Sequence, residues 1–445
     1  MKIVPGLLIG ILTSSVLGSV VPASAGVPVA PVTRRVQGAV LLGQSDPTTQ
    51  LIGTEIFIPA GLDRQTPAQN GLASLVAECI LQTPVALAAG NLLTLREAVA
   101  VEGGSLSYAV DGQYVRFYLE GLGQTYSSVL LPAFRQAMSA PDFSAATRKA
   151  ARLELQGRIQ RDGESPLALG LAMLDRTFYE NSDAGLPQFG TLAMQLQFTG
   201  DDARTFYASH YRRNGTIVSA IGNLGALAPN DLPSLADALP GGSSRAAVVK
   251  ITRLSGASRR LVAHRDIPLP WLVAQYRAPG IDSPDFGAML ALTAFLDRTL
   301  SEVAEIPSVS TPGRAQRSAG ATYNFDTKPA SLVLYVGGGL GDPARTFATA
   351  LTVVKVLQRA RLHSGIDDLK AGASGLFASG ANTLQERAWL AGVFVMRGAS
   401  ADYAGRVAAA ISAMTAADLQ RAAKRYLGSP TVALIFPRAA PAPAR

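Results

Sequence analysis

The chain has 445 residues, of which 48% are hydrophobic and only 16% are charged, so it can bury the cores of two or three ordinary domains. Its formal net charge is +8, but the basic residues are mostly arginines that lie in scattered pairs. The sequence lacks the stripe of basic and aromatic residues that is typical of nucleic-acid binding, and no nucleic-acid partner is expected. The charge indicates a solvated surface that favours acidic partners.

The start of the sequence, from Met1 to Ala25, has the layout of a secretory signal. One lysine precedes an apolar stretch, and Ala23-Ser24-Ala25 supplies an A-x-A cleavage site. We expect cleavage near Ala25-Gly26 and a periplasmic or secreted mature chain. A retained membrane anchor is the alternative, which the short apolar core disfavours. No integral membrane association is expected after cleavage, because no internal run reaches the roughly 18 apolar residues of a membrane span.

Cys79 is the one cysteine of the sequence, so no intramolecular disulfide can form. It lies among Leu75, Val76, Ile80 and Leu81, and this apolar setting predicts a small core residue. Stability must therefore come from burial of apolar surface.

The sequence consists of two similar halves. A strand, a Gly-Asp turn and an apolar helix occur near the front and again later, where Gly61 and Asp63 correspond to Gly280 and Asp282. A polar-capped helix that ends in tyrosine, a turn and a β-branched strand close each half, and here Tyr211 corresponds to Tyr426. Two anchors in the same order at nearly the same offset indicate a tandem duplication.

Strands and helices come in clusters rather than in strict alternation, which predicts an α+β fold with two homologous tandem domains. We expect a signal peptide over residues 1–25 and an N-terminal domain over 26–241. A linker rich in small and polar residues follows over 242–262, a C-terminal domain over 263–438, and a disordered tail over 439–445.

Several segments together resemble the insulinase/pitrilysin metallopeptidases, the inverzincins. The segments are "GLDRQTPAQNGLAS", "LREAVAVEGGSLSYAVDGQYVRFYLEGL", "GLPQFGTLAMQLQFTGDDARTFYASHY", "YRRNGTIVSAIGN" and "PGIDSPDFGAMLALTAFL". Each pattern is loose, but together they cover nearly all of the mature chain. The resemblance implies that two tandem α+β domains form one half of a clamshell around a chamber for extended peptides.

The same resemblance implies a zinc site, which this sequence lacks. The family carries H-x-x-E-H on its first long helix, where two histidines on one helix face bind Zn²⁺ and the glutamate activates the bound water. Here Ser74 replaces the first histidine, Ala77 the base and Glu78 the second histidine. Glu154 follows Glu78 near the position of the third ligand, although a register shift around "RDGESP" is open.

We therefore expect no catalytic residue and no bound metal in this chain. A Glu78/Glu154 pair offers only hard oxygens, which suit Ca²⁺ or Mg²⁺ better than Zn²⁺. His210, His264 and His363 lie far apart in the sequence and do not restore the motif.

The resemblance also implies that an arginine and a tyrosine of the C-terminal domain hold substrate. Arg317 and Tyr323 are the candidates, and their spacing is one position shorter than in R-x-x-x-G-x-x-Y. An alternative alignment places Ser301 and Ser308 at these positions and removes the pair. In the structural interpretation, Arg317 is a surface charge and Tyr323 an ordinary strand aromatic.

The leading hypothesis is a non-catalytic subunit that forms a heterodimer with a zinc-bearing homologue and helps to enclose peptide substrates. Zn²⁺ is then expected in the partner and no cofactor in this chain, which alone is expected to lack peptidase activity. One alternative is a stand-alone peptide-binding or structural envelope protein. The other is a metallopeptidase with non-standard metal ligation.

Overall fold

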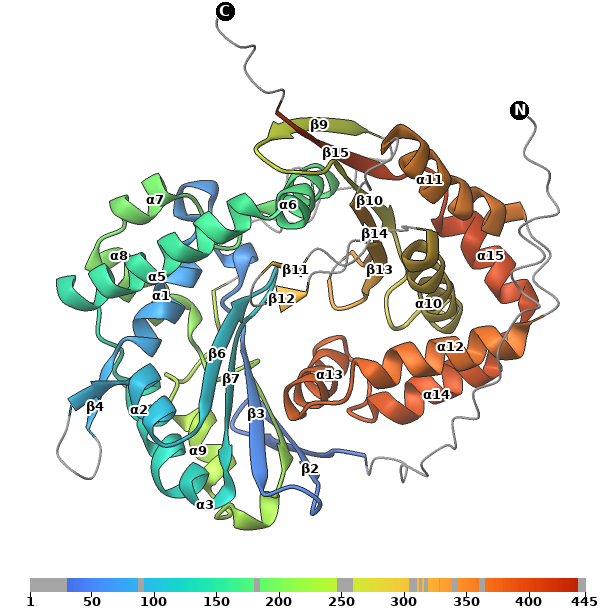
Figure 1. Cartoon of the computed structure of the whole chain (residues 1–445). Helices are drawn as coiled ribbons and strands as arrows, with labels where there is room; N and C mark the ends of the chain where they lie inside the picture. The colour runs from blue at the N-terminus through green and yellow to red at the C-terminus, as the bar shows by residue number, and fades with distance from the viewer. Residues whose placement is uncertain are drawn as a thin grey trace, which may run out of the picture.

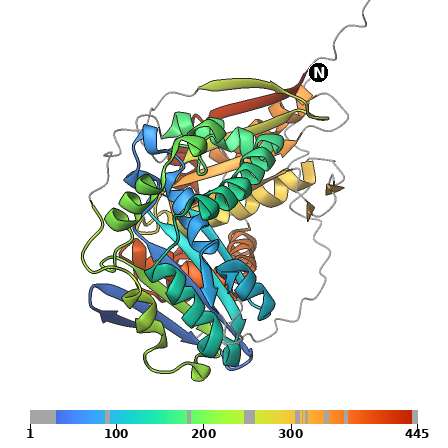
Figure 2. The same ribbon diagram turned by 90° about the vertical axis from the view of Figure 1, so that its left-hand side faces the viewer.

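The computed structural model describes residues 30–86, 92–179, 185–245, 259–303, 310–311, 314–315, 319–327, 329–337, 343–359 and 365–438. These residues form two halves, each with one mixed β-sheet and a set of helices (Figure 1). In Figure 2 the strands of the second half, coloured yellow to red, lie above those of the first half, which are blue to cyan except for the yellow-green β8.

The first half is built on a six-stranded sheet with the order β1-β2-β8-β3-β7-β6. β2 and β8 are parallel, and the other neighbours in this sheet are antiparallel. Its strands are β1 (Val32–Val36), β2 (Ala39–Ser45), β3 (Leu51–Ile58), β6 (Ser105–Val110), β7 (Val115–Leu122) and β8 (Ile217–Gly222). A separate hairpin pairs β4 (Pro84–Ala86) with β5 (Leu92–Thr94).

Strand β3 shows why this sheet is covered on both faces. Ile52, Ile56 and Ile58 face the core of the first half, whereas Phe57 belongs to the core of the second half. Successive side chains of a strand point to opposite faces, so both faces of β3 are buried.

The helices of the first half cover mainly one face of this sheet. They are α1 (Leu72–Leu81), α2 (Leu95–Val101), α3 (Gly123–Thr125), α4 (Leu131–Ser139), α5 (Ala145–Glu164), α6 (Pro166–Phe178), α7 (Leu192–Gln197), α8 (Gly200–His210) and α9 (Asp231–Asp237). A 3₁₀ turn, η2 (Leu62–Arg64), follows β3, and a π-helical turn, Tyr126–Leu130, joins α3 to α4.

The second half repeats this plan with the sheet order β13-β14-β10-β15-β9. Its strands are β9 (Arg260–Arg265), β10 (Trp271–Arg277), β13 (Ala319–Asn324), β14 (Ser331–Gly337) and β15 (Thr431–Pro437), with a separate pair β11 (Ser310–Thr311) and β12 (Arg314–Ala315). Its helices are α10 (Phe286–Val303), α11 (Pro343–Arg359), α12 (Ile366–Ser379), α13 (Leu384–Met396), α14 (Tyr403–Ala413) and α15 (Ala416–Tyr426).

The two sheets share their topology. β9 pairs in parallel with β15, and β15, β10, β14 and β13 follow as antiparallel neighbours, just as β8, β3, β7 and β6 follow β2. The closing helices α8 and α15 even begin with the same capping box, Thr199 with Asp202 and Thr415 with Asp418. The duplicated plan predicted from the sequence is thus present in the structure. The exact domain boundaries stay predictions, and β9 begins at Arg260, inside the predicted linker.

One helix of each half packs against the sheet of the other half. Helix α13 of the second half packs on β3 and β8, and helix α6 of the first half packs on β10 and β15 (Figure 1). Glycines permit this close approach, because a Cβ atom at Gly392 would meet the ring of Phe57 and one at Gly170 would meet Val273. The halves are therefore held together by two reciprocal helix-on-sheet contacts.

Within the described residues, no helix combines the length and the apolar character that crossing a membrane requires.

Candidate functional site

Helix α1, on which the resemblance predicts the degenerate zinc motif, is buried along its whole length. Gly71 starts it with a φ of 93°, and a side chain there would meet the backbone of Phe189. The Ser74 hydroxyl donates a hydrogen bond of 2.7 Å to the carbonyl oxygen of Gln188. Ala77, at the position of the base, is also fully buried, so neither residue presents a reactive group to solvent.

Glu78 lies in a cluster of cations. Its fully buried carboxylate forms an ion pair with Arg96, from α2, and a second one with Arg158, from α5, at 3.5 Å. Gln82 donates a further hydrogen bond of 3.2 Å to the carboxylate. Arg96 also reaches Glu154, with 3.7 Å between Nη1 and Oε2. A guanidinium group therefore lies between the two carboxylates that the sequence offered as remnants of a metal site.

An aromatic ring borders the ion pairs of Glu78. The Arg158 guanidinium lies over the ring of Tyr108, 4.6 Å from its centroid. Burial, followed by the neighbouring Glu78 carboxylate, raises the pKa of Tyr108 well above its usual range. The phenol of Tyr108 therefore stays protonated beside the ion-paired glutamate.

The residues present do not fit a zinc site. Among the described residues, no group of three or more histidine, cysteine or acidic side chains is placed to hold a metal ion. The carboxylate of Glu78 is already neutralised by Arg96 and Arg158, and these cations would repel a divalent ion. Cys79 offers no thiolate either, because burial raises the pKa of its thiol to about 12.

Of the two substrate contacts expected in the C-terminal domain, the structure describes Tyr323 only. Tyr323 is buried on β13, its ring lies 5.9 Å from that of Phe286, and its hydroxyl donates to the carbonyl oxygen of Pro279. This environment explains Tyr323 as a core residue, and its contact with substrate stays a prediction. Arg317 lies outside the described residues.

The alternative alignment has the same limit. Ser301 is exposed on α10, and its hydroxyl donates a bond of 2.8 Å to the Asp297 carbonyl oxygen. Ser308 lies outside the described residues, so the structure does not favour one alignment over the other.

A cavity of about 720 Å³ lies between the two halves, beside the degenerate site. The first half contributes η2, the turn between β6 and β7, helix α6 and residues 185–190. The second half contributes Asn324, Asp326 and Thr327, after β13, and Met396 and Arg397, at the end of α13. Gln188 lines the cavity while its carbonyl oxygen accepts the Ser74 hydrogen bond, which connects the two features.

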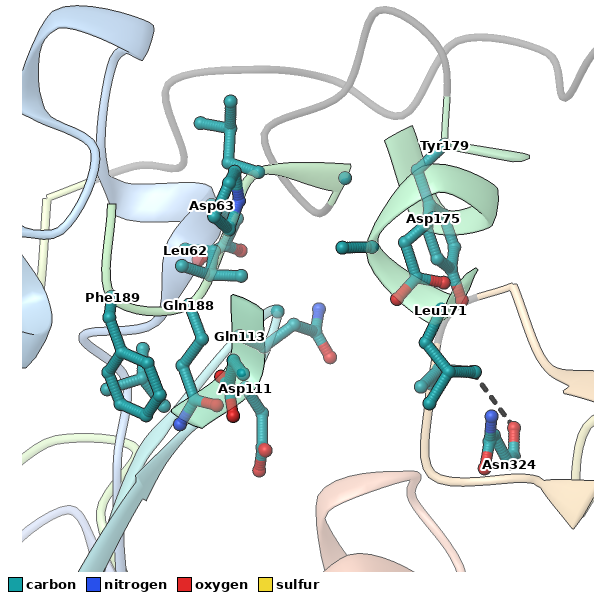
Figure 3. Close-up of a pocket in the computed structure, with 18 of the residues that line it drawn as sticks. Leu62, Asp63, Asp111, Gln113, Leu171, Asp175, Tyr179, Gln188, Phe189 and Asn324 are labelled. Carbon is teal, nitrogen blue, oxygen red and sulfur yellow. Dashed lines mark hydrogen bonds between the residues drawn. The ribbon is translucent and has the colours of Figure 1, made fainter. Parts of the chain in front are cut away.

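Carboxylates face this cavity from several directions. In Figure 3, Asp63 and Asp111 lie on one wall and Asp175 on the opposite one. Arg116 forms an ion pair with Asp111 and another, of 2.6 Å, with the buried Glu55. Asp175 instead accepts a hydrogen bond of 3.0 Å from the amide of Gln275, across the interface between the halves.

Burial sets the protonation of two of these groups. It raises the pKa of Asp175 to about 6, which the hydrogen bond from Gln275 opposes. It likewise raises the pKa of Asp326 to about 6, with a further upward contribution from the charge of Asp111. Both carboxylates are thus ionised at neutral pH in an environment that disfavours their charge.

Sequence reasoning did not find Arg96, Arg158 or the cavity. One signal was present for the cations, since a glutamate among the apolar residues of α1 requires a buried partner. Another was present for the cavity, since Asp175 lies one helical turn after Leu171 and next to Leu174 on α6. An aspartate near the apolar face of a helix is unusual and marks a polar environment.

Comparison with known proteins identifies the fold. No family model and no curated protein matches the sequence. The fold is that of the M16-like peptidases, so the predicted α+β fold and the resemblance to the insulinase/pitrilysin fold are confirmed.

Three solved structures illustrate the likeness. A protease from Helicobacter pylori has a TM-score of 0.76 at 16% identity, over 92% of this chain and 100% of that chain. The peptidase M16 inactive domain from Pseudomonas fluorescens has a TM-score of 0.75 at 15% identity, over 93% and 100%. A chain of complex III2 from Candida albicans has a TM-score of 0.69 at 14% identity, over 91% and 95%. At such identities the comparison shows the fold alone.

Proposed function

We propose that this chain is a non-catalytic M16-fold subunit that pairs with a zinc-bearing homologue and helps to enclose peptides for proteolysis by that partner. The observation that carries the proposal is the ion-paired Glu78 on an otherwise intact α1. The Arg96 guanidinium pairs with the carboxylates of Glu78 and Glu154, which would have to be free to bind a metal ion. Helix α1 nevertheless still packs in the core.

The chemistry of the site supports this assignment. Metal-assisted peptide hydrolysis needs an ion that polarises the carbonyl group and a base that takes a proton from water. Ala77 has no proton acceptor, and Ser74 uses its hydroxyl in a structural hydrogen bond to Gln188. The predicted secretory signal assigns the subunit, by the same proposal, to the periplasm or the extracellular space.

The test is reconstitution with an H-x-x-E-H-bearing M16 homologue from the same genome. Light scattering after size exclusion gives the stoichiometry, and hydrolysis of a quenched fluorescent peptide gives the activity. We expect a heterodimer that is more active than the homologue alone, and no activity when the homologue's own glutamate base is replaced by glutamine. Absence of a complex, together with unchanged hydrolysis, would contradict the proposal.

A second candidate is a stand-alone binding or structural protein. The cavity favours it, because residues of both halves of this chain line a space of small-molecule size. The complex III2 chain shows that the fold occurs within a larger assembly. Saturable ligand binding by the isolated chain, with no heterodimer in the reconstitution, would favour this candidate.

The third interpretation, a metallopeptidase with non-standard ligation, loses support. Such ligation would need the carboxylate of Glu78, which instead forms ion pairs with Arg96 and Arg158.

A further inference from the structure

We propose that the cavity between the two halves binds an organic cation with ammonium or guanidinium groups, either a free polyamine or a basic residue of a peptide. This inference goes beyond the proposed function, because it concerns a site within one chain and does not require the zinc-bearing partner.

The size of the cavity suits such a ligand. Small-molecule sites typically enclose about 300–1,000 Å³, and this cavity of about 720 Å³ lies within that range. It lies at the interface of the two halves, where ligand sites often occur. An occupant would contact α6 of the first half and the Asn324–Thr327 segment of the second half.

The charge of the lining contrasts with that of the chain. The sequence has a formal charge of +8, whereas the described residues that line the cavity include five aspartates and one arginine, Arg397, a formal balance of −4 among them. Asp63 is paired with Arg64 and Asp111 with Arg116. These two carboxylates are therefore already compensated.

Asp175 and Asp326 are different. In the described part of the chain, no ion pair is formed by either, although burial disfavours the charge of both. The nearby Arg397 donates a hydrogen bond of 3.0 Å to Gln113. The charges of Arg116 and Arg397 oppose the rise in the pKa of Asp326 without forming an ion pair with it among the described residues. A cationic ligand would add the direct, hydrogen-bonded compensation that stabilises a desolvated charge.

The remaining walls select the shape of the cation. Leu62, Leu171 and Phe189 also line the cavity (Figure 3), so an alkyl stem can lie against apolar surface while its charged ends reach oxygen atoms. A bare divalent ion fits poorly. It needs several ligands at one point, and no cluster of three or more metal-binding side chains occurs among the residues that the structure describes.

The experiment is isothermal titration calorimetry of the full chain with three probes. Spermidine represents a free polyamine, acetyl-arginyl-leucine amide represents a basic peptide, and acetyl-glutamyl-leucine amide is the acidic control. We expect saturable binding of at least one cationic probe and none of the acidic one. Binding of spermidine alone assigns a free polyamine, and binding of the arginyl peptide alone assigns a peptide segment.

The variants are Asp175→Asn, Asp326→Asn and both together, with Asp201→Asn as the matched control. Asp201 is exposed on α8 and does not line the cavity. Each single cavity variant is expected to weaken cation binding at least about tenfold, because it removes a hydrogen bond to a charged group. Asp201→Asn is expected to bind like the unmodified chain.

Thermal unfolding of each variant checks that it folds, and we expect no loss of stability because asparagine removes a disfavoured charge at the same volume. The proposal is overturned if neither cationic probe binds at millimolar concentration. It is overturned equally if the folded double variant binds as tightly as the unmodified chain. Neither result depends on the reconstitution, so failure here is distinguishable from failure of the proposed function.

Discussion

Arg96→Met tests whether the ion pairs of Glu78 hold α1 in place. The substitution removes the guanidinium that lies between Glu78 and Glu154 but keeps an apolar stem of similar length. The Glu78 side chain is 0% exposed, so its carboxylate cannot turn to solvent for compensation.

The expected loss follows from what remains around the carboxylate. Removal of one partner from a buried ion pair typically costs about 3–5 kcal/mol, because the other charge stays buried. Here Arg158 remains at 3.5 Å and Gln82 still donates a hydrogen bond of 3.2 Å. We therefore expect the lower end, about 3 kcal/mol of the free energy of unfolding.

Urea denaturation at pH 7.5, followed by far-UV circular dichroism, measures this loss. The matched control is Arg204→Met on α8, whose ion pair with Asp201 is exposed, with 59% and 87% of the two side chains accessible. Exposed pairs contribute about 0–1 kcal/mol, so the control is expected to unfold close to the unmodified chain.

The double variant Arg96→Met/Glu78→Gln separates charge from packing. With both charges absent, most of the lost stability should return, because replacing a buried pair is far less costly than breaking it. An Arg96→Met variant as stable as the control would refute the view that this guanidinium compensates Glu78.

Three further predictions concern the interface and the buried groups. Gly392→Leu should destabilise the chain by about 1–3 kcal/mol because the new side chain meets Phe57, whereas Gly375→Ala, with open space around it, should be neutral or stabilising, as thermal unfolding will show. The pKa of Asp175 is raised to about 6 in the folded state, so as the pH falls the folded state binds this proton at a higher pH than the unfolded state does. Its contribution to stability should therefore rise as pH falls from about 7 to 5, a gain that urea titrations should find missing in Asp175→Asn. Cys79, fully buried and with a pKa of about 12, should resist alkylation by iodoacetamide until the chain unfolds, as followed by mass spectrometry.

Much of the fold could be predicted from local patterns. The Gly-Asp turns and the tyrosine-ended helices mark equivalent points of the two halves. The turns follow β3 and β10, the helices precede β8 and β15, and these strands occupy matching places in the two sheets. The exchange of α6 and α13 was not predicted, because amphipathic periodicity shows that a helix face is buried but not which sheet buries it. Gly170 and Gly392, at the contact points, were the available hints.

The candidate site divides in the same way. Ser74, Ala77 and Glu78 could be placed because they share one short helix with recognisable flanks. Arg96 and Arg158 approach Glu78 from other helices, and spacing along one helix does not reveal such partners. The cavity joins segments as distant in the sequence as Leu62 and Arg397, a proximity that only the tertiary structure supplies.

The zinc content of the purified chain tests the central claim, that α1 has kept its packing and lost its metal chemistry. The chain is saturated with Zn²⁺, freed of unbound ion by gel filtration, and analysed by inductively coupled plasma mass spectrometry. We predict far less than one equivalent of zinc, and no change on Glu78→Gln. One equivalent of zinc that disappears in Glu78→Gln would contradict the account.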